Sequence, residues 1–189
     1  ARTEPLDDLA RLNFAVRVDA PGTLLRDYQT AKDWATDPNG SASLSTRYYL
    51  SDAVFVAAVE GDQEALKNIE SALKKPVYPL YLGRRSCPAG YDLVLGIREE
   101  SAEEALRNEE WHVPEHRRAE FPDPVQLRIL RDAKPGEQGD LVQDVPVSFN
   151  QEHRQYAVRA VVSAEPKTVE NPKGKRHSDV DFMRTVTEA

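Results

Sequence analysis

The sequence predicts an α+β protein whose first half is a ferredoxin-like (RRM-like) unit. Segments with helical and strand periodicity follow one another in the order helix, strand, strand, helix, strand up to residue 97. This is the order of a βαββαβ unit that lacks its opening strand. Because that strand normally lies inside the sheet, its removal exposes backbone groups and a core face. We expect either that this chain omits an N-terminal part of the natural protein, which we favour, or that another segment fills the gap.

The first segments lead into a long excursion. Pro5 to Arg11 places leucines at helical spacing. Phe14 to Val18 alternates apolar with polar residues, as a half-buried strand does. The region from Leu24 to Ser51 is rich in Thr, Asp and Ser, and it is typical of a long hairpin or an excursion from the body. After it, the continuously apolar Ala53 to Val59 predicts a buried strand.

A helix and a third strand complete the unit. The helix is expected between Gly61 and Pro76, where leucines and an isoleucine line one face and lysines occupy the C-terminal end. The apolar segment Leu93 to Ile97 predicts the third strand.

The second half is expected to be rich in strands. Ser101 to Asn108 has the spacing of a short helix with a capping box. Alternating residues in Val125 to Leu130 and in Tyr156 to Val162 predict two later strands. From Ala164 onward the sequence is polar and basic, which predicts a tail with little order of its own. We therefore expect a ferredoxin-like domain at 1–97, a β-rich part at 98–163 and a tail at 164–189.

Composition limits the class of protein. A chain of 189 residues with 40% hydrophobic residues can bury one core with an extra subdomain. No apolar run is long enough to span a bilayer and no leader opens the sequence, so we expect a cytoplasmic protein without membrane contact. Cys87 is the single cysteine, and the four histidines form no tight ligand cluster. We expect no disulfide framework, no metal and no cofactor.

One motif combines aromatic and basic residues. The run from Tyr78 to Pro88 joins an apolar segment to Arg84 and Arg85 directly after Gly83. Glycine permits backbone conformations closed to other residues, and two guanidiniums match the geometry of phosphate oxygens. The motif therefore indicates either a phosphate site or a solvated basic surface. The net charge of −7 does not decide between them, because binding depends on where the charges lie.

Three blocks resemble a known family. Leu25 to Thr30, Arg47 to Val56 and Tyr78 to Pro88, together with the helical stretch before the last block, are similar to CasD-like subunits of the type I-E CRISPR surveillance complex, called Cascade. These subunits belong to the RAMP superfamily. The resemblance covers roughly residues 2 to 97. Family members begin with an apolar strand before the first helix, which agrees with the missing strand.

The resemblance implies a non-catalytic RNA-binding subunit that supports antiviral defence. It would bind the 5′ handle of the crRNA, and the excursion at about 24–51 would be the family's thumb, which packs against the neighbouring backbone subunit. The implied partners are that handle, the backbone subunit CasC, the large subunit CasA and, through the complex, target DNA. The residues expected to bind RNA are Arg26, Tyr28, Arg47, Tyr48, Gly83, Arg84, Arg85 and Ser86.

Other interpretations stay open. A metal-independent endoribonuclease that cuts CRISPR repeats, as in the type I-C system, would need a general acid and base, for which histidine is the usual residue. All histidines fall outside the matching blocks, which favours binding over cleavage. A protein-interaction module is a third interpretation. Among single residues, Arg26 could pair with Asp27 or Asp33. Only one of Tyr48 and Tyr49 can face RNA, because side chains alternate along a strand. Trp34 could stack on a base, contact a partner or pack within the protein.

Overall fold

The computed structural model describes residues 9, 11–32, 35–90, 92–148 and 153–176. Most of the helix predicted at Pro5 to Arg11 lies outside the described residues, and so does Trp34. The chain divides into two compact units. Unit 1 comprises residues 1–17, 57–110 and 126–168, and unit 2 comprises residues 18–56, 111–125 and 169–189.

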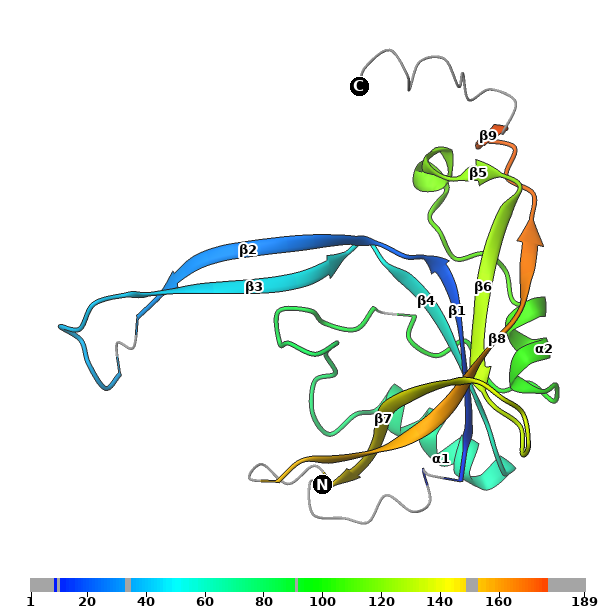
Figure 1. The fold of residues 1–189 in the computed structure, drawn as a ribbon, viewed down its shortest axis with the longest axis horizontal. Coiled ribbons are helices and arrows are strands. Elements are labelled where there is room, and N and C mark those ends of the chain that lie inside the picture. The colour runs from blue at the N-terminus through cyan, green and yellow to red at the C-terminus, as the bar shows by residue number, and fades with distance from the viewer. Residues whose placement is uncertain (1–8, 10, 33–34, 91, 149–152, 177–189) are drawn as a thin grey trace. The chain divides into compact units, whose positions relative to one another are not determined.

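A five-stranded sheet has the strand order β4-β1-β6-β8-β7 (Figure 1). Its strands, in that order, are Val54–Glu60, Asn13–Ala20, Val125–Asp132, Gln155–Val169 and Asp140–Ser148. β7 pairs with β8 in antiparallel fashion, with two register shifts. The strands predicted near residues 14, 53, 125 and 156 are confirmed. The predicted burial of the strand near residue 53 is wrong, because β4 lies at the edge of the sheet and Val56 is its one buried residue, while Phe55 is 50% exposed.

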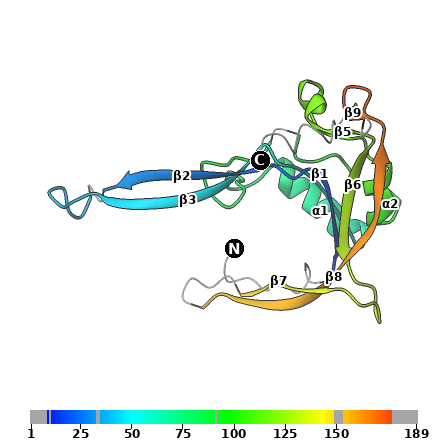
Figure 2. The same cartoon turned by 45° about the horizontal axis from the view of Figure 1, so that its top comes forward.

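Two small sheets accompany the large one. β2 (Thr23–Ala31) pairs with β3 (Ser43–Ser51) in antiparallel fashion, and β5 (Pro122–Asp123) pairs with β9 (Lys175–Arg176) in parallel fashion. In both views β2 and β3 run side by side along their length as a ribbon (Figures 1 and 2).

The helices are few and begin at side-chain caps. α1 (Gln63–Lys74) begins at Asp62, whose carboxylate accepts hydrogen bonds from two backbone N–H groups of the first turn. α2 (Ala102–Asn108) begins at the predicted capping box of Ser101 and Glu104. A 3-10 helix, η1, covers Glu115–Glu120. No helix among the described residues is long and apolar enough to cross a membrane.

A buried arginine organises the core of unit 1. Arg17 is fully buried on β1, and its guanidinium donates to the carbonyl oxygens of Leu106, Glu109 and Glu110 at the end of α2. Carbonyl oxygens in the last turn of a helix lack donors within it, so the guanidinium satisfies the Leu106 carbonyl and offsets the negative end of the helix dipole. Glu109 and Glu110 come directly after α2. Leu127 and Ile129 of β6 complete this core.

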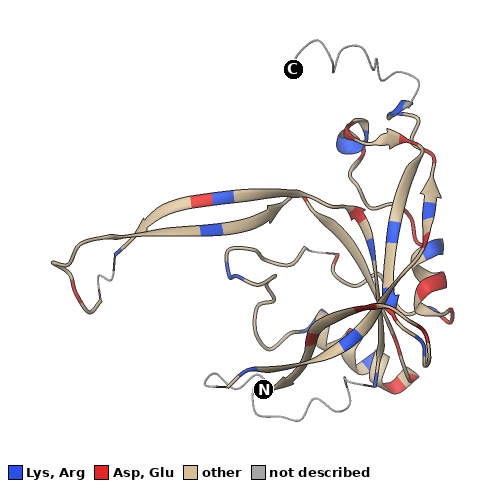
Figure 3. Ribbon diagram, viewed as in Figure 1, with Lys and Arg blue, Asp and Glu red and all other residues tan. Residues whose placement is uncertain are grey.

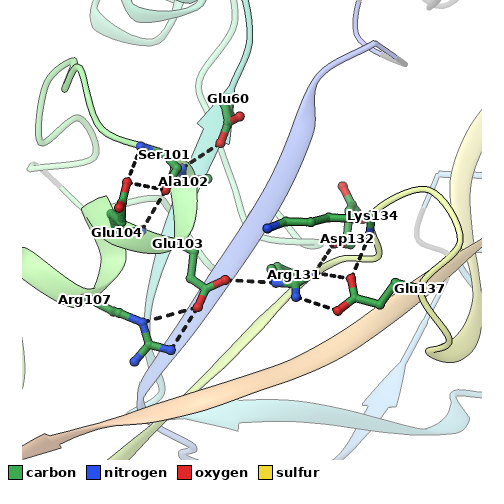
Figure 4. A network of polar contacts seen from close by, with 10 residues as sticks. All are labelled: Glu60, Ser101, Ala102, Glu103, Glu104, Arg107, Arg131, Asp132, Lys134 and Glu137. Atoms are coloured by element: carbon green, nitrogen blue, oxygen red, sulfur yellow. Dashed lines mark hydrogen bonds and ion pairs between the residues drawn. The ribbon is translucent and has the colours of Figure 1, made fainter.

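An ion network lies at the surface of the same unit (Figure 4). Arg131 donates to Glu103 at 3.0 Å and to both carboxylate oxygens of Glu137 at 2.7 and 2.8 Å. The hydrogen bonds from Arg131 and from the backbone N–H of Lys134 lower the pKa of Glu137 to about 2. The carboxylate of Glu60 accepts a hydrogen bond from the backbone N–H of Ala102, at the start of α2.

Unit 2 has its own packed centre. Trp111 donates its indole N–H to the carbonyl oxygen of Asp19 at 3.1 Å, and the ring of Phe121 meets the ring of Trp111 edge-on with centroids 5.5 Å apart. The guanidinium of Arg118 lies 5.2 Å from the ring centroid of Trp111. Asp19 is buried and accepts a hydrogen bond from the backbone N–H of His112 at 2.8 Å.

The strand predicted at Leu93 to Ile97 is wrong. These residues belong to no strand, and the side chains of Leu93, Leu95 and Ile97 are 38–42% exposed. In a ferredoxin-like unit the last strand pairs with the opening strand, and the described residues contain no such strand. An apolar segment needs a hydrogen-bonded neighbour to become a strand, so composition alone overestimated it.

The tail is also more ordered than expected. β8 continues to Val169, and the side-chain amide of Asn171 donates to the carbonyl oxygens of Arg118, Phe121 and Pro122 at 2.8–3.2 Å. A composition argument cannot detect such a polar anchor. Residues 177–189 lie outside the described residues, and the division of the chain at residues 97 and 163 stays a prediction.

Candidate nucleic-acid interface

The β2–β3 ribbon begins and ends at two residues with positive φ. Gly22 has φ +74°, and a Cβ atom there would lie 2.7 Å from the carbonyl oxygen of Ser51 and from the Cβ of Ala53. Only glycine fits this position. Asp52, with φ 58°, accepts a hydrogen bond from the Ser51 hydroxyl at 2.9 Å. Between these ends, all nine residues of β2 pair with the nine residues of β3.

The register divides the ribbon into two chemically different faces. Side chains alternate along each strand, and directly paired residues share a face. The first face, which we call the Tyr28 face, consists of Leu24, Arg26, Tyr28, Thr30, Leu44, Thr46, Tyr48 and Leu50. The opposite face, the Arg47 face, consists of Thr23, Leu25, Asp27, Gln29, Ala31, Ser43, Ser45, Arg47, Tyr49 and Ser51.

The Tyr28 face combines aromatic rings with a cation. The guanidinium of Arg26 lies 5.8 Å from the ring centroid of Tyr28, and Tyr48 is the direct cross-strand partner of Arg26. Tyr28 and Tyr48 are 60% and 56% exposed. The face contains no Asp or Glu, so it can offer stacking surfaces and a guanidinium to a ligand.

The Arg47 face is polar at its centre and internally bonded. Arg47 is the cross-strand partner of Asp27. The side-chain amide of Gln29 is oriented so that both its nitrogen and its oxygen form hydrogen bonds. In this orientation the nitrogen donates to Asp27 Oδ2 at 3.2 Å and the oxygen accepts from Arg47 Nη1 at 3.0 Å. The charged residues of the ribbon gather midway along it (Figure 3). Asp27 thus shares a face with Arg47, and Arg26 lies on the opposite face. This arrangement contradicts the alternative in which Arg26 pairs with Asp27, and Asp33 lies outside the described residues.

The basic motif forms a tight turn in unit 1. Tyr81 and Pro88 form an isolated antiparallel bridge, and the backbone N–H of Leu82 donates to the carbonyl oxygen of Cys87 at 2.8 Å. The N–H of Cys87 donates to the carbonyl oxygen of Arg84 at 2.9 Å. Gly83 enters the turn with φ +78°, and a Cβ atom added to it would meet none of the described residues within 4 Å.

The turn presents polar side chains to solvent. Arg84, Arg85 and Ser86 are exposed, and Cys87 is half-buried. Backbone hydrogen bonds from Leu82 and Cys87 close the turn. Two guanidiniums and a hydroxyl therefore lie at the surface, where phosphate oxygens can reach them.

Comparison with known proteins assigns the family. A family model described as CRISPR-associated protein (Cas_Cas5) matches residues 1–162. The chain belongs to this Cas5 family. The match agrees with the resemblance read from the three sequence blocks.

Individual relatives are consistent with the assignment. This Cas5-family chain is 38% identical to the CRISPR system Cascade subunit CasD of Escherichia coli (strain K12) over 115 residues, 52% of the chain and 51% of the relative. The chain thus spans about half the length of the curated relative it matches. A solved structure titled "CRISPR RNA-guided surveillance complex" matches with a TM-score of 0.69 and 26% identity, over 99% of this chain and 80% of the other. A second, titled "Crystal structure of Cas protein", matches with a TM-score of 0.59 and 28% identity, over 93% and 75%.

The structure brings together some of the predicted site residues of this Cas5-family chain and separates others. Arg26, Tyr28 and Tyr48 share one face, whereas Arg47 lies on the other. Sequence reasoning missed Gln29, which bridges Asp27 and Arg47. The period-two alternation of each strand was visible in the sequence, but the pairing of the strands was not, and pairing decides which residues meet.

Proposed function

We propose that this chain is a non-catalytic subunit of a type I-E CRISPR surveillance complex that binds the 5′ handle of the crRNA. The observation that carries the proposal is the acid-free Tyr28 face, which places Arg26 between two exposed tyrosines in a chain of the Cas5 family. Single-stranded RNA is held by cations on phosphates and aromatic rings under bases. The E. coli relative is itself named as a Cascade subunit.

Two segments would hold the handle. The first is the β2–β3 ribbon, which carries Arg26, Tyr28, Arg47 and Tyr48, and the second is the turn that carries Gly83, Arg84, Arg85 and Ser86. No metal or cofactor is needed for this role. The partners would be the backbone subunit CasC and the large subunit CasA, with target DNA reached through the complex in the cytoplasm.

We further propose a RAMP fold of the ferredoxin-like type, whose sheet one further strand would complete. Its sheet would precede a smaller C-terminal β part. Two features support this. α1 has an apolar face, yet none of its residues is buried, and the apolar segment 93–97 is partly exposed and unpaired by any described strand. A strand beside β4 would cover apolar surface of this kind.

Copurification tests the function. The full-length protein, expressed with its partner subunits, should retain RNAs that share one repeat-derived 5′ end when the bound RNA is sequenced. If the subunits copurify without RNA, the chain acts as a protein-interaction module instead. If this chain alone cuts RNA at the repeat, it is an endoribonuclease instead.

A further inference from the structure

We infer that the two faces of the β2–β3 ribbon have different roles: the Tyr28 face contacts single-stranded RNA, whereas Arg47 is a positioning residue that acts through the opposite face. The inference rests on the proposed function and deepens it, because it assigns separate tasks to residues that sequence reasoning treated as one group.

The bonding of Arg47 is the first argument. Asp27 faces Arg47 across the strands, and Gln29 connects the two with bonds of 3.2 and 3.0 Å. All three residues are half-buried. A phosphate would have to compete with the Asp27 carboxylate for the same cation, so the Arg47 face is poorly suited to an anion.

The chemistry of the Tyr28 face is the second argument. Arg26 has aromatic neighbours on its face and no carboxylate there. No carboxylate on that face therefore offsets the positive charge of Arg26, although the protein as a whole carries a net charge of −7. Tyr28 and Tyr48 offer ring faces for stacking, so Arg26 can meet a phosphate while the tyrosines lie against bases.

The marginal stability of a two-stranded ribbon is the third argument. An isolated ribbon depends on cross-strand pairs for its register. A slip of one residue would move Tyr28 or Tyr48 to the opposite face. The bonded group of Asp27, Gln29 and Arg47 sits midway along the ribbon, where it opposes such a slip.

The leucines of the Tyr28 face would also suit a protein partner. Leu24, Leu44 and Leu50 are 53–67% exposed. A guanidinium between two tyrosines, without a carboxylate, nevertheless matches RNA in both charge and ring surface. We therefore assign RNA to this face and make protein contact an outcome of the test.

The test measures RNA dissociation from the assembled complex of the full-length protein at several salt concentrations. Arg26→Gln should weaken RNA retention and reduce the salt slope by about 0.7 for each lost phosphate contact. Tyr48→Leu should weaken retention roughly tenfold without changing the slope, and Tyr48→Phe should restore it. Arg154→Gln removes an equal charge from an exposed position and serves as the matched control.

Variants of Arg47 separate positioning from contact. Arg47→Gln should weaken retention by up to about fivefold, the worth of a cross-strand pair, with an unchanged salt slope. The exchange Asp27→Arg with Arg47→Asp rebuilds an opposite-charge pair in reversed order, so it should restore retention. Thermal unfolding of each variant checks that the body of the protein is intact.

Each contrary result has a distinct meaning. If Arg47→Gln and the exchange both reduce the slope as Arg26→Gln does, Arg47 binds RNA directly and its positioning role is refuted. If changes on the Tyr28 face abolish binding of a partner subunit in the absence of RNA, the face is a protein interface. If the wild-type complex holds no RNA, the proposed function itself fails. If changes at Arg84 and Arg85 weaken RNA retention but changes in the ribbon do not, only the role of the ribbon is refuted.

Discussion

At the scale of single residues, Arg84 and Arg85 are exposed, whereas Arg17 is fully buried in unit 1. Backbone hydrogen bonds from Leu82 and Cys87 close the turn that carries Arg84 and Arg85. Their substitution should therefore spare the fold.

The first prediction concerns this pair. Arg84→Ala combined with Arg85→Ala should weaken RNA retention in the assembled complex and flatten its salt dependence, because each phosphate neutralised on a single strand contributes a slope of about 0.7. Filter binding across a salt series measures both quantities, with Arg154→Ala as control. An unchanged slope and affinity would refute the phosphate site.

A second prediction at this scale concerns Glu137. Hydrogen bonds from Arg131 and the Lys134 backbone lower its pKa from 4.5 to about 2 in the folded protein. A lowered pKa stabilises the fold above the unfolded pKa, and the contribution is lost as pH falls from about 4.5 to about 2. Glu137→Gln should flatten the pH dependence of unfolding free energy in this window. Denaturant unfolding at several pH values measures it, and Glu99→Gln, an exposed change, should leave the profile unaltered.

At the scale of elements, periodicity predicted what depends on neighbours in sequence. The capping box at Ser101 and the strands near Phe14 and Tyr156 follow from local spacing, and each is present. The segment Leu93 to Ile97 is as apolar as the segments that form strands, but no described strand lies beside it, so it forms no strand. The pairing of Arg26 with Tyr48 required the register, which depends on contacts distant in sequence.

The outer part of the ribbon provides the third prediction. Replacing residues 31–44 with a short Gly-Ser linker removes the outermost strand pairs, Ala31 with Ser43 and Thr30 with Leu44, and leaves the inner pairs in place. Loop-closure entropy changes slowly with length, so the unfolding midpoint should change little. Binding of the backbone subunit should nevertheless fail in a pull-down. A shortened protein that unfolds, but assembles normally under stabilising conditions, would show that this segment is structural and is not a thumb.

At the scale of the whole molecule, an acidic chain carries small basic sites. The net charge is −7, while the Tyr28 face has no carboxylate and the turn at Gly83 exposes two arginines. Such a distribution suits a protein that holds one RNA end inside a complex better than one that searches along free nucleic acid.

The last prediction separates binding from cleavage. Metal-independent cleavage uses the RNA's own 2′-hydroxyl and needs a general base, a general acid and a cation for the developing charge. No histidine lies in the β2–β3 ribbon or in the turn from Tyr81 to Pro88, so these sites offer cations without the usual proton shuttle. Full-length protein incubated alone with repeat RNA and a chelator should therefore leave the RNA uncut, as judged by denaturing gel electrophoresis. Specific products ending in a 2′,3′-cyclic phosphate, lost when one histidine is replaced, would establish a ribonuclease instead.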